Sequence, residues 1–217
     1  MDKLRLSLYG CSPLDLPQIL GPYIGNRIRR RGRFPGGGLG LSVEHRPNIL
    51  YLSAEDVHKS SDSTGAVRFM TVEVVMSRNL EEGEEKIGFD LIAHIPLEEV
   101  VNLRTTLPIL RSEELCVGMC NLARLSLFGA DVSTFFVEPE IRGSHTSKDL
   151  LPSLDSISIT RSILSGGDWG PFTGFLARRA TVGNRIYSLK IDGFPHMDTD
   201  VIERISRVVE AFGHVDR

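Results

Sequence analysis

The chain of 217 residues is 41% hydrophobic and 24% charged, ordinary proportions for a globular protein that exclude a wholly disordered one. Its formal net charge of -3 excludes nucleic-acid binding through bulk positive charge, so any contact with phosphate requires a local basic patch. The sequence contains no run near the ~18 consecutive apolar residues of a membrane-spanning helix.

The length favours one domain, because domains average roughly 150 residues. Three cysteines, Cys11, Cys116 and Cys120, lack the paired spacing of a disulfide framework and favour a reducing compartment. The first residues alternate charged and apolar side chains and do not form a secretory signal. We therefore expect a soluble intracellular protein, cytoplasmic or nuclear.

The first third of the chain predicts short elements around a basic loop. Alternating leucines predict a strand at 4–8, and a serine followed by proline predicts the start of a short helix over 12–21. Residues 25–40 are rich in glycine and arginine and are predicted as a loop. A short strand follows at 49–52.

The middle of the chain predicts an antiparallel hairpin. Apolar residues alternate with polar ones over 67–77, and a second alternation runs over 87–95. The acidic residues 81–85 between them predict a solvated connection. Helices are then predicted at 97–103 and at 112–127.

The last third predicts further strands and a closing helix. Strands are expected at 132–137 and 156–163, and a second hairpin joins 172–181 to 185–192 through the turn Val182-Gly183-Asn184. Apolar residues at the spacing of one helix face predict an amphipathic helix over 200–212, with Asp200 as its cap. The fold class is therefore predicted as α+β, a mainly antiparallel sheet with a few packed helices, in a single domain.

The most informative segment is a cluster of five arginines, Arg27, Arg29, Arg30, Arg31 and Arg33, followed by three glycines. Guanidinium groups so close together repel one another unless anions neutralise them. The cluster therefore predicts contact with RNA or nucleoprotein, with acidic lipid headgroups, or with a nuclear import receptor. The alternative is a solvated loop whose arginines pair with the acidic residues 81–85.

A second candidate is the aromatic pair Trp169 and Phe172, which lies among glycines and a proline. It predicts either an exposed docking loop or a turn whose tryptophan folds back onto the core. The second reading is favoured, because tryptophan is rarely left fully exposed.

The residues do not predict a catalytic, cofactor or metal site. Cys116 and Cys120 stand four apart on a predicted helix, but neither histidines nor further cysteines complete a zinc site, so buried thiols are expected. The glycines at 36–40 lack the lysine and the strand–helix setting of a nucleotide loop. We expect a protein that is not an enzyme.

The order of the predicted elements over residues 67–212 resembles that of rhabdovirus matrix proteins. The segments that carry the resemblance are the strand Arg68-Phe69-Met70-Thr71-Val72-Glu73-Val74, the segment Leu122–Ala130, a late hairpin and a closing helix. The chain departs from that family in its acidic net charge and in lacking a PPxY motif. The resemblance implies a virion-layer protein that self-associates, condenses nucleocapsid and lies against the inner membrane leaflet.

The sequence therefore predicts one leading function and one alternative. The first is a structural or assembly protein, matrix-like and homo-oligomeric, that contacts RNA or an acidic membrane surface through the arginines. The alternative is an intracellular adaptor that binds protein partners and uses the arginines as a nuclear localisation signal.

Overall fold

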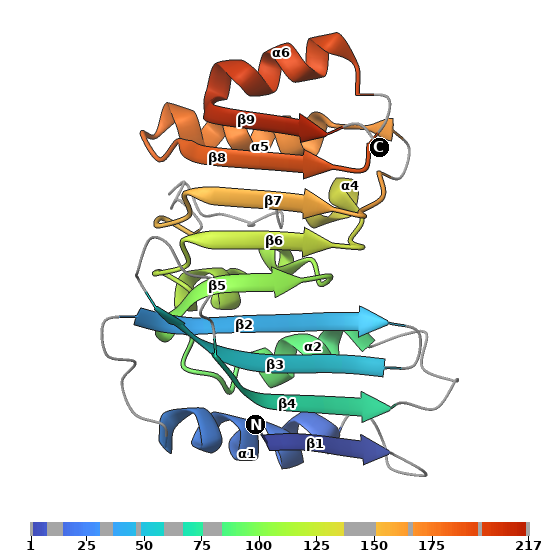
Figure 1. Cartoon of the computed structure of the whole chain (residues 1–217), viewed down its shortest axis with the longest axis vertical. Coiled ribbons are helices and arrows are strands. Elements are labelled where there is room, and N and C mark those ends of the chain that lie inside the picture. The colour runs from blue at the N-terminus through green and yellow to red at the C-terminus, as the bar shows by residue number, and fades with distance from the viewer. Residues whose placement is uncertain are drawn as a thin grey trace. The chain divides into compact units, whose positions relative to one another are not determined.

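The computed structural model describes residues 2–7, 15–30, 37–46, 49–58, 67–75, 84–136, 151–164, 167–194 and 197–215 (Figure 1). The chain combines helices with sheet strands and is of the α+β class, as predicted. It divides into two compact units, Met1–Leu107 and Pro108–Arg217. The single-domain organisation remains a prediction, because compact units of this size occur within one domain and as two domains.

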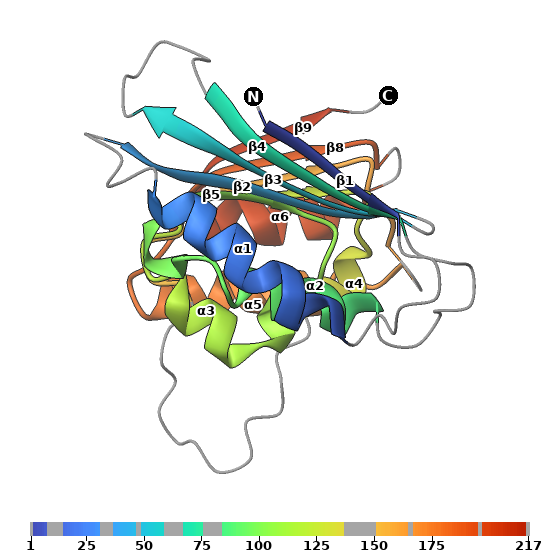
Figure 2. The same ribbon diagram turned by 90° about the horizontal axis from the view of Figure 1, so that it is seen from below.

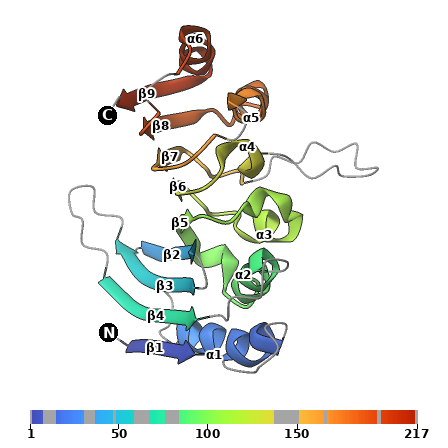
Figure 3. The same ribbon diagram turned by 90° about the vertical axis from the view of Figure 1, so that its right-hand side faces the viewer.

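The first unit places its helices on one side of its strands, in the order β1-β4-β3-β2-β5. β3 runs antiparallel to β2 and β4, whereas β1 runs parallel to β4 and β5 parallel to β2. Figures 2 and 3 show α1 and α2 on the same side of these strands. The elements are β1 (Asp2–Ser7), α1 (Leu16–Arg30), β2 (Gly37–Arg46), β3 (Ile49–His58), β4 (Val67–Val75), α2 (Glu84–Ile92), the 3-10 helix η2 (Leu97–Glu99) and β5 (Val100–Thr105).

The second unit alternates strands with helices, and its strands follow one another in the sheet in chain order, β6-β7-β8-β9. All three pairs are parallel. Figures 2 and 3 show α4, α5 and α6 on one side of these strands. The elements are the 3-10 helix η3 (Ile109–Arg111), α3 (Glu113–Gly118), β6 (Arg124–Phe128), α4 (Val132–Phe135), β7 (Ser156–Thr160), α5 (Gly170–Thr181), β8 (Ile186–Asp192), α6 (Thr199–Val208) and β9 (Val209–Val215).

The second unit contains an internal repeat that the analysis of the sequence missed. Residues 32 positions apart pair in register, Leu125 with Ile157 and Ile157 with Leu189. The same backbone hydrogen bonds recur, since the carbonyl of Ala123 accepts from 155 and 156, and that of Asp155 accepts from 187 and 188. Each repeat buries three apolar side chains in the pattern L-x-x-L-x-L, namely Leu122, Leu125 and Leu127, then Leu154, Ile157 and Ile159, then Ile186, Leu189 and Ile191. Stacked copies of one strand–helix motif share a continuous core.

The prediction of a mainly antiparallel sheet is wrong, because most strand pairs in the described part of the chain are parallel. Antiparallel pairing is confined there to the two partners of β3. Parallel neighbours need a crossover connection, and a helix supplies it between every two successive strands of the second unit. Residues 172–181 were predicted as a strand, but they form α5. This wrong assignment conceals the alternation of strands and helices in the second unit.

The predicted hairpin of 67–77 with 87–95 is also wrong in its second half. β4 is the expected first strand, but residues 84–92 form α2. Ile87, Leu91 and Ile95 are buried, and a spacing of four fits both an alternating strand and one helix face. Ile92, buried beside Leu91, fits only the helix. The connecting residues 81–83 lie outside the described residues.

Several element boundaries also differ from the predictions. The expected helix at 97–103 is η2 followed by β5, and the expected helix at 112–127 ends at Gly118, after which β6 begins. The predicted strand at 132–137 is the short helix α4. In each case the local pattern of apolar residues suits both structures, and neighbours distant in sequence decide between them.

The closing helix is present but shorter than predicted. α6 ends at Val208, and residues 209–215 pair with β8 as β9. The helix begins after Asp198 rather than at Asp200. The strands predicted at 4–8, 156–163 and 185–192 are confirmed as β1, β7 and β8. The helix predicted to start at Ser112 begins at Glu113, and the Ser112 hydroxyl caps it by accepting the Leu115 N–H at 3.3 Å.

Candidate interaction surfaces

The predicted arginine loop is mostly regular structure. Residues 25–30 form the last turns of α1 and residues 37–40 belong to β2, so the loop prediction is wrong for both ends of 25–40. The helix continues because Leu20, Ile24 and Ile28 bury one face at a spacing of four, a periodicity that the intervening glycines obscure.

The described arginines, Arg27, Arg29 and Arg30, are all exposed at the C-terminal end of α1, where the helix dipole favours positive charge. Arg29 donates a hydrogen bond from Nη2 to the carbonyl oxygen of His94 at 3.4 Å. Arg31, Arg33 and the acidic residues 81–83 lie outside the described residues. Whether the cluster binds anions or pairs within the chain therefore remains a prediction.

Two glycines let α1 approach the end of α2 closely. A Cβ added to Gly21 would lie 2.0 Å from the His94 ring, and one added to Gly25 would lie 2.3 Å from the His94 carbonyl oxygen. A side chain at either position therefore requires the two helices to separate. This packing holds α1 by its inner face and leaves its outer face exposed.

The outer face of α1 carries an exposed stripe that is apolar at one end and basic at the other. Ile19 is 69% exposed and Tyr23 is 50% exposed, and Arg27 and Arg30 are exposed further along the helix. Spacings of three and four place these residues along one side of a helix. Exposed apolar side chains beside cations are typical of helices that lie at a membrane surface.

The predicted docking role of Trp169 and Phe172 is wrong, and the alternative that the tryptophan folds back onto the core is confirmed. Trp169 is 6% exposed and Phe172 is 0% exposed. The Phe172 ring lies 4.6 Å from the ring of Phe136 and 5.9 Å from that of Trp169, measured between centroids. These aromatic residues pack α4 and α5 together and are unavailable to a partner.

Of the two thiols predicted to be buried, Cys116 lies in the core, whereas Cys120 is exposed and its prediction is wrong. The Cys116 Sγ lies 3.5 Å from the carbonyl oxygen of Ile109, and burial, with a smaller contribution from Glu113, raises the pKa of Cys116 to about 12. Such a thiol stays protonated at neutral pH and is a poor nucleophile. Among the described residues, His, Cys, Asp and Glu side chains do not gather in groups of three as a metal site requires.

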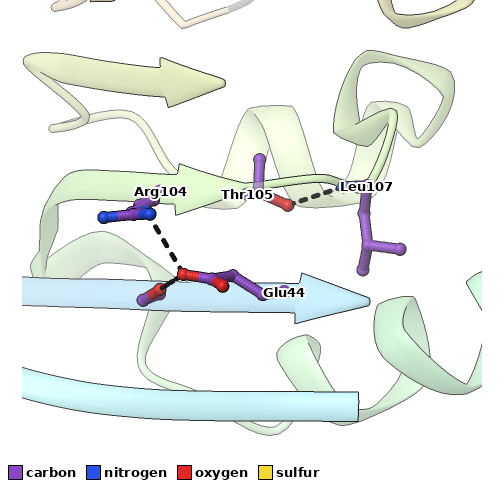
Figure 4. Close-up of polar contacts among 5 residues, drawn as sticks. Glu44, Arg104, Thr105 and Leu107 are labelled. Atoms are coloured by element: carbon purple, nitrogen blue, oxygen red, sulfur yellow. Dashed lines mark hydrogen bonds and ion pairs between the residues drawn. The ribbon is translucent and has the colours of Figure 1, made fainter. Parts of the chain in front are cut away.

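Polar side chains occupy the side of the first unit's strands that α1 and α2 leave uncovered. Figure 4 shows Glu44 of β2 beside Arg104 of β5, with 3.2 Å between the carboxylate Oε1 and the guanidinium Nε. Ser42 donates to the same carboxylate at 3.3 Å. Thr105, the buried residue that follows Arg104 on β5, accepts the Leu107 N–H on its hydroxyl at 2.9 Å and closes the turn after the strand (Figure 4). The pair fixes the two strands and neutralises one charge of each sign.

The second unit presents a more continuous uncovered surface, which we call the open face. It consists of the outward side chains of β6, β7 and β8, opposite the side on which α4, α5 and α6 lie (Figures 2 and 3). No helix covers it in the described part of the chain. In register from strand to strand, its residues are Arg124, Ser156 and Ser188, then Ser126, Ser158 and Lys190, then Phe128, Thr160 and Asp192.

The open face combines short hydroxyl side chains with a small excess of positive charge. Its serines and threonine are partly exposed, so they leave backbone and hydroxyl groups within reach of a ligand. Arg124 and Lys190 are exposed cations, and Asp192 is the acidic residue of these three strands. Short polar side chains on a flat surface suit a macromolecular partner better than a small molecule, which needs a concave pocket.

The residue after each strand of the repeat has a left-handed backbone. Its φ is +66° at Gly129, +50° at Arg161 and +94° at Gly193. Among these three equivalent positions, Arg161 is the one that is not a glycine. Its guanidinium carbon lies 5.8 Å from the centroid of the Phe128 ring, on the open face.

Analysis of the sequence missed the open face, although a signal for it exists. The recurring L-x-x-L-x-L pattern, with polar residues between the apolar ones, marks the strands and the direction in which their other side chains point. Arg178 is exposed on α5, whereas its neighbour Arg179 is buried.

No protein-family model, curated protein or solved structure matches this chain. The resemblance to rhabdovirus matrix proteins remains a prediction, and the late hairpin that enters it is the helix α5 followed by the strand β8. In the described part of the chain, no helix is long and apolar enough to cross a membrane.

Proposed function

We propose that this protein is a non-enzymatic binding module that holds a protein partner against the open face of β6, β7 and β8. The observation that carries the proposal is the repeat itself, in which α4, α5 and α6 of the described residues lie on one side of the strands. Strand–helix repeats with the L-x-x-L-x-L pattern, the pattern of leucine-rich repeats, commonly use such an extended surface for binding. This reading favours the adaptor alternative among the functions expected from the sequence.

The chemistry of the open face supports a peptide or protein surface as the ligand. Its central residues are Ser126, Ser158 and Lys190, which pair side by side on three strands. Neighbouring strands are about 4.8 Å apart, so these side chains span roughly 10 Å and offer several hydrogen-bonding groups in a row. Such an array matches the regular spacing of amides and side chains along a polypeptide.

Peptide selection with a blocking variant tests the proposal. Short random peptides are selected on the immobilised protein and then measured against Ser158→Trp, which fills the centre of the open face. We expect Ser158→Trp to weaken binding about tenfold or more. The matched control is Val117→Trp, because Val117 is 57% exposed on α3, and it should bind like the parent protein. Circular dichroism confirms that both variants fold. If the selected peptides bind Ser158→Trp unchanged, the open face is not the binding surface.

A second candidate function is contact with an acidic membrane surface through the outer stripe of α1. Exposed Ile19 and Tyr23 continue into Arg27 and Arg30 on one side of the helix, which favours this contact. We expect the protein to sediment with vesicles that contain phosphatidylserine and not with neutral phosphatidylcholine vesicles.

The variant pair Ile19→Asp and Arg30→Glu separates the two contributions to membrane binding. Both substitutions should release the protein from acidic vesicles. Added salt should weaken the part of the binding that depends on Arg30, because salt screens exposed charges. The matched control is Glu203→Gln on α6, an exposed change outside the stripe. Binding that is indifferent to both substitutions would rule out this function and with it the matrix-like assembly role.

A further inference from the structure

Arg161 stands where the other two repeats have glycine. The equivalent residues Gly129 and Gly193 adopt the same left-handed backbone, which glycine enters without steric cost. An arginine there crowds its Cβ against the backbone and is disfavoured. Glycine is the favoured residue at such a position, so the arginine is there at a cost in stability.

The Arg161 side chain is placed to meet a ligand. The residue is exposed, and its guanidinium lies over the Phe128 ring, which restricts its motion. Within the described part of the chain, the structure gives it no carboxylate partner, so its N–H donors point to solvent or to a ligand. A guanidinium held by an aromatic face is a preorganised group for a carboxylate.

The charges around Arg161 select the sign of the ligand. Lys190 lies on the neighbouring strand, paired with Ser158, and Arg124 lies on β6 at the other end of the open face. Asp192, beside Thr160, is the acidic residue that opposes them. Together with Arg161, the open face therefore carries an excess of positive charge and is complementary to an anion.

We propose that the segment bound on the open face is acidic and that Arg161 and Lys190 each bind one of its carboxylates. This inference rests on the proposed function and names the partner's chemistry. Lys190 pairs with Ser158 on β7, and Arg161 follows Thr160, the last residue of that strand, so the two cations lie at different positions along the strand direction. Side chains of an extended segment alternate between its two sides, so the two carboxylates of the partner should be two or four positions apart.

An acidic peptide suits the open face better than RNA does. Its aromatic side chain, Phe128, is already covered by the Arg161 guanidinium, so it offers no platform on which bases can stack. Its three basic residues are also accompanied by Asp192, whereas nucleic-acid surfaces concentrate charge of one sign. A row of hydroxyl groups between two cations instead matches the carboxylates and amides of a peptide.

Fluorescence anisotropy with a defined probe tests the inference. The probe is a labelled peptide with glutamate at every second position in a Gly-Ser background, and its control has glutamine in place of every glutamate. The parent protein should bind the glutamate peptide about tenfold more tightly than the glutamine peptide, and salt should reduce the difference. Equal binding of the two peptides would overturn the inference.

The substitution Arg161→Gly separates a binding role from a structural one. It restores the residue found in the other repeats, so the melting temperature should stay unchanged or rise by about 3 °C, while affinity for the glutamate peptide should fall about tenfold. Arg161→Lys keeps the charge and should lose less. A clear fall in melting temperature on Arg161→Gly would show instead that the arginine is kept for its contact with Phe128, and the inference would be wrong.

The outcomes distinguish failure of this inference from failure of the proposed function. If selected peptides are blocked by Ser158→Trp but are not acidic and ignore Arg161→Gly, the open face binds a partner and only the acidic chemistry is wrong. If Ser158→Trp also has no effect, both are wrong. Tighter binding of a single-stranded RNA that Arg161→Gly abolishes would replace the peptide with nucleic acid.

Discussion

Replacing Arg179 should destabilise the protein strongly. Substitution of an arginine on a surface helix usually has little effect, but this side chain is buried. Arg179 is 2% exposed, and it donates from Nη1 to the carbonyl oxygen of Leu151 at 2.9 Å and from Nη2 to that of Leu154 at 2.8 Å. Both carbonyls belong to the turn that precedes β7. The arginine therefore ties α5 to that turn from inside the protein.

The magnitude follows from the two hydrogen bonds. A hydrogen bond from a charged donor contributes about 1.5–3 kcal/mol net, and each carbonyl left without a donor in the interior adds a desolvation cost. Arg179→Met, which keeps the apolar length of the side chain, should thus lower the free energy of unfolding by about 3–5 kcal/mol. Since stabilities of 5–15 kcal/mol are typical, such a loss is a large fraction of the total.

Urea denaturation followed by circular dichroism measures this loss. The matched control is Arg178→Met, because Arg178 is the adjacent residue of the same helix and is exposed. It should change the free energy of unfolding by no more than about 0.5 kcal/mol. Equal effects of the two substitutions would refute the reasoning, since they would show that the buried hydrogen bonds of Arg179 contribute nothing beyond a surface arginine.

Three further predictions concern packing and pH. Gly25→Ala should destabilise the protein by about 1–3 kcal/mol in urea denaturation despite the better helix propensity of alanine, because the new Cβ meets the His94 carbonyl oxygen; an unchanged midpoint would contradict the close packing of α1. Phe136→Ala should cost about 3–5 kcal/mol, because the residue is buried among other aromatic rings, and calorimetry should show the lower melting temperature. The pKa of Cys116 is raised above its ordinary value of 9.0, so its contribution to stability is fully present below pH 9 and is lost as pH rises toward about 12, at about 1.4 kcal/mol per pH unit. Cys116→Ala should remove that part of the alkaline loss of stability. In the native protein at pH 8, a thiol reagent should label exposed Cys120 and leave buried Cys116 unmodified, and rapid labelling of Cys116 would contradict the raised pKa.

Strands with strict alternation are predictable from the local sequence. β1, β4 and β7 are recognised because apolar and polar residues alternate along their sequences, a pattern that does not depend on the neighbouring strand. The cap at Ser112 is equally local, because a hydroxyl and a backbone N–H three residues away suffice for it. These features depend on contacts within a few residues.

Segments that combine both periodicities were decided by tertiary packing. Residues 87–95 satisfy an alternating pattern and a helical one, and only the burial of Ile92 beside Leu91 distinguishes them. In α5, Phe172, Phe175 and Leu176 follow helical spacing, but the flanking glycines and the turn at Gly183 also suit a hairpin. Which structure forms depends on the strand that each segment packs against.

The sequence by itself determined the class of the fold and the absence of a helix-length apolar run, because composition and local periodicity govern these features. It predicted burial for Cys116 and Cys120 alike, and only Cys116 is buried. Only the tertiary structure decided that successive strands of the second unit lie parallel, that Arg179 is buried while Arg178 is exposed, and that Arg161 lies beside Phe128. These features arise from residues roughly 30 positions apart meeting in register, a pairing that no local pattern encodes until the repeat is recognised.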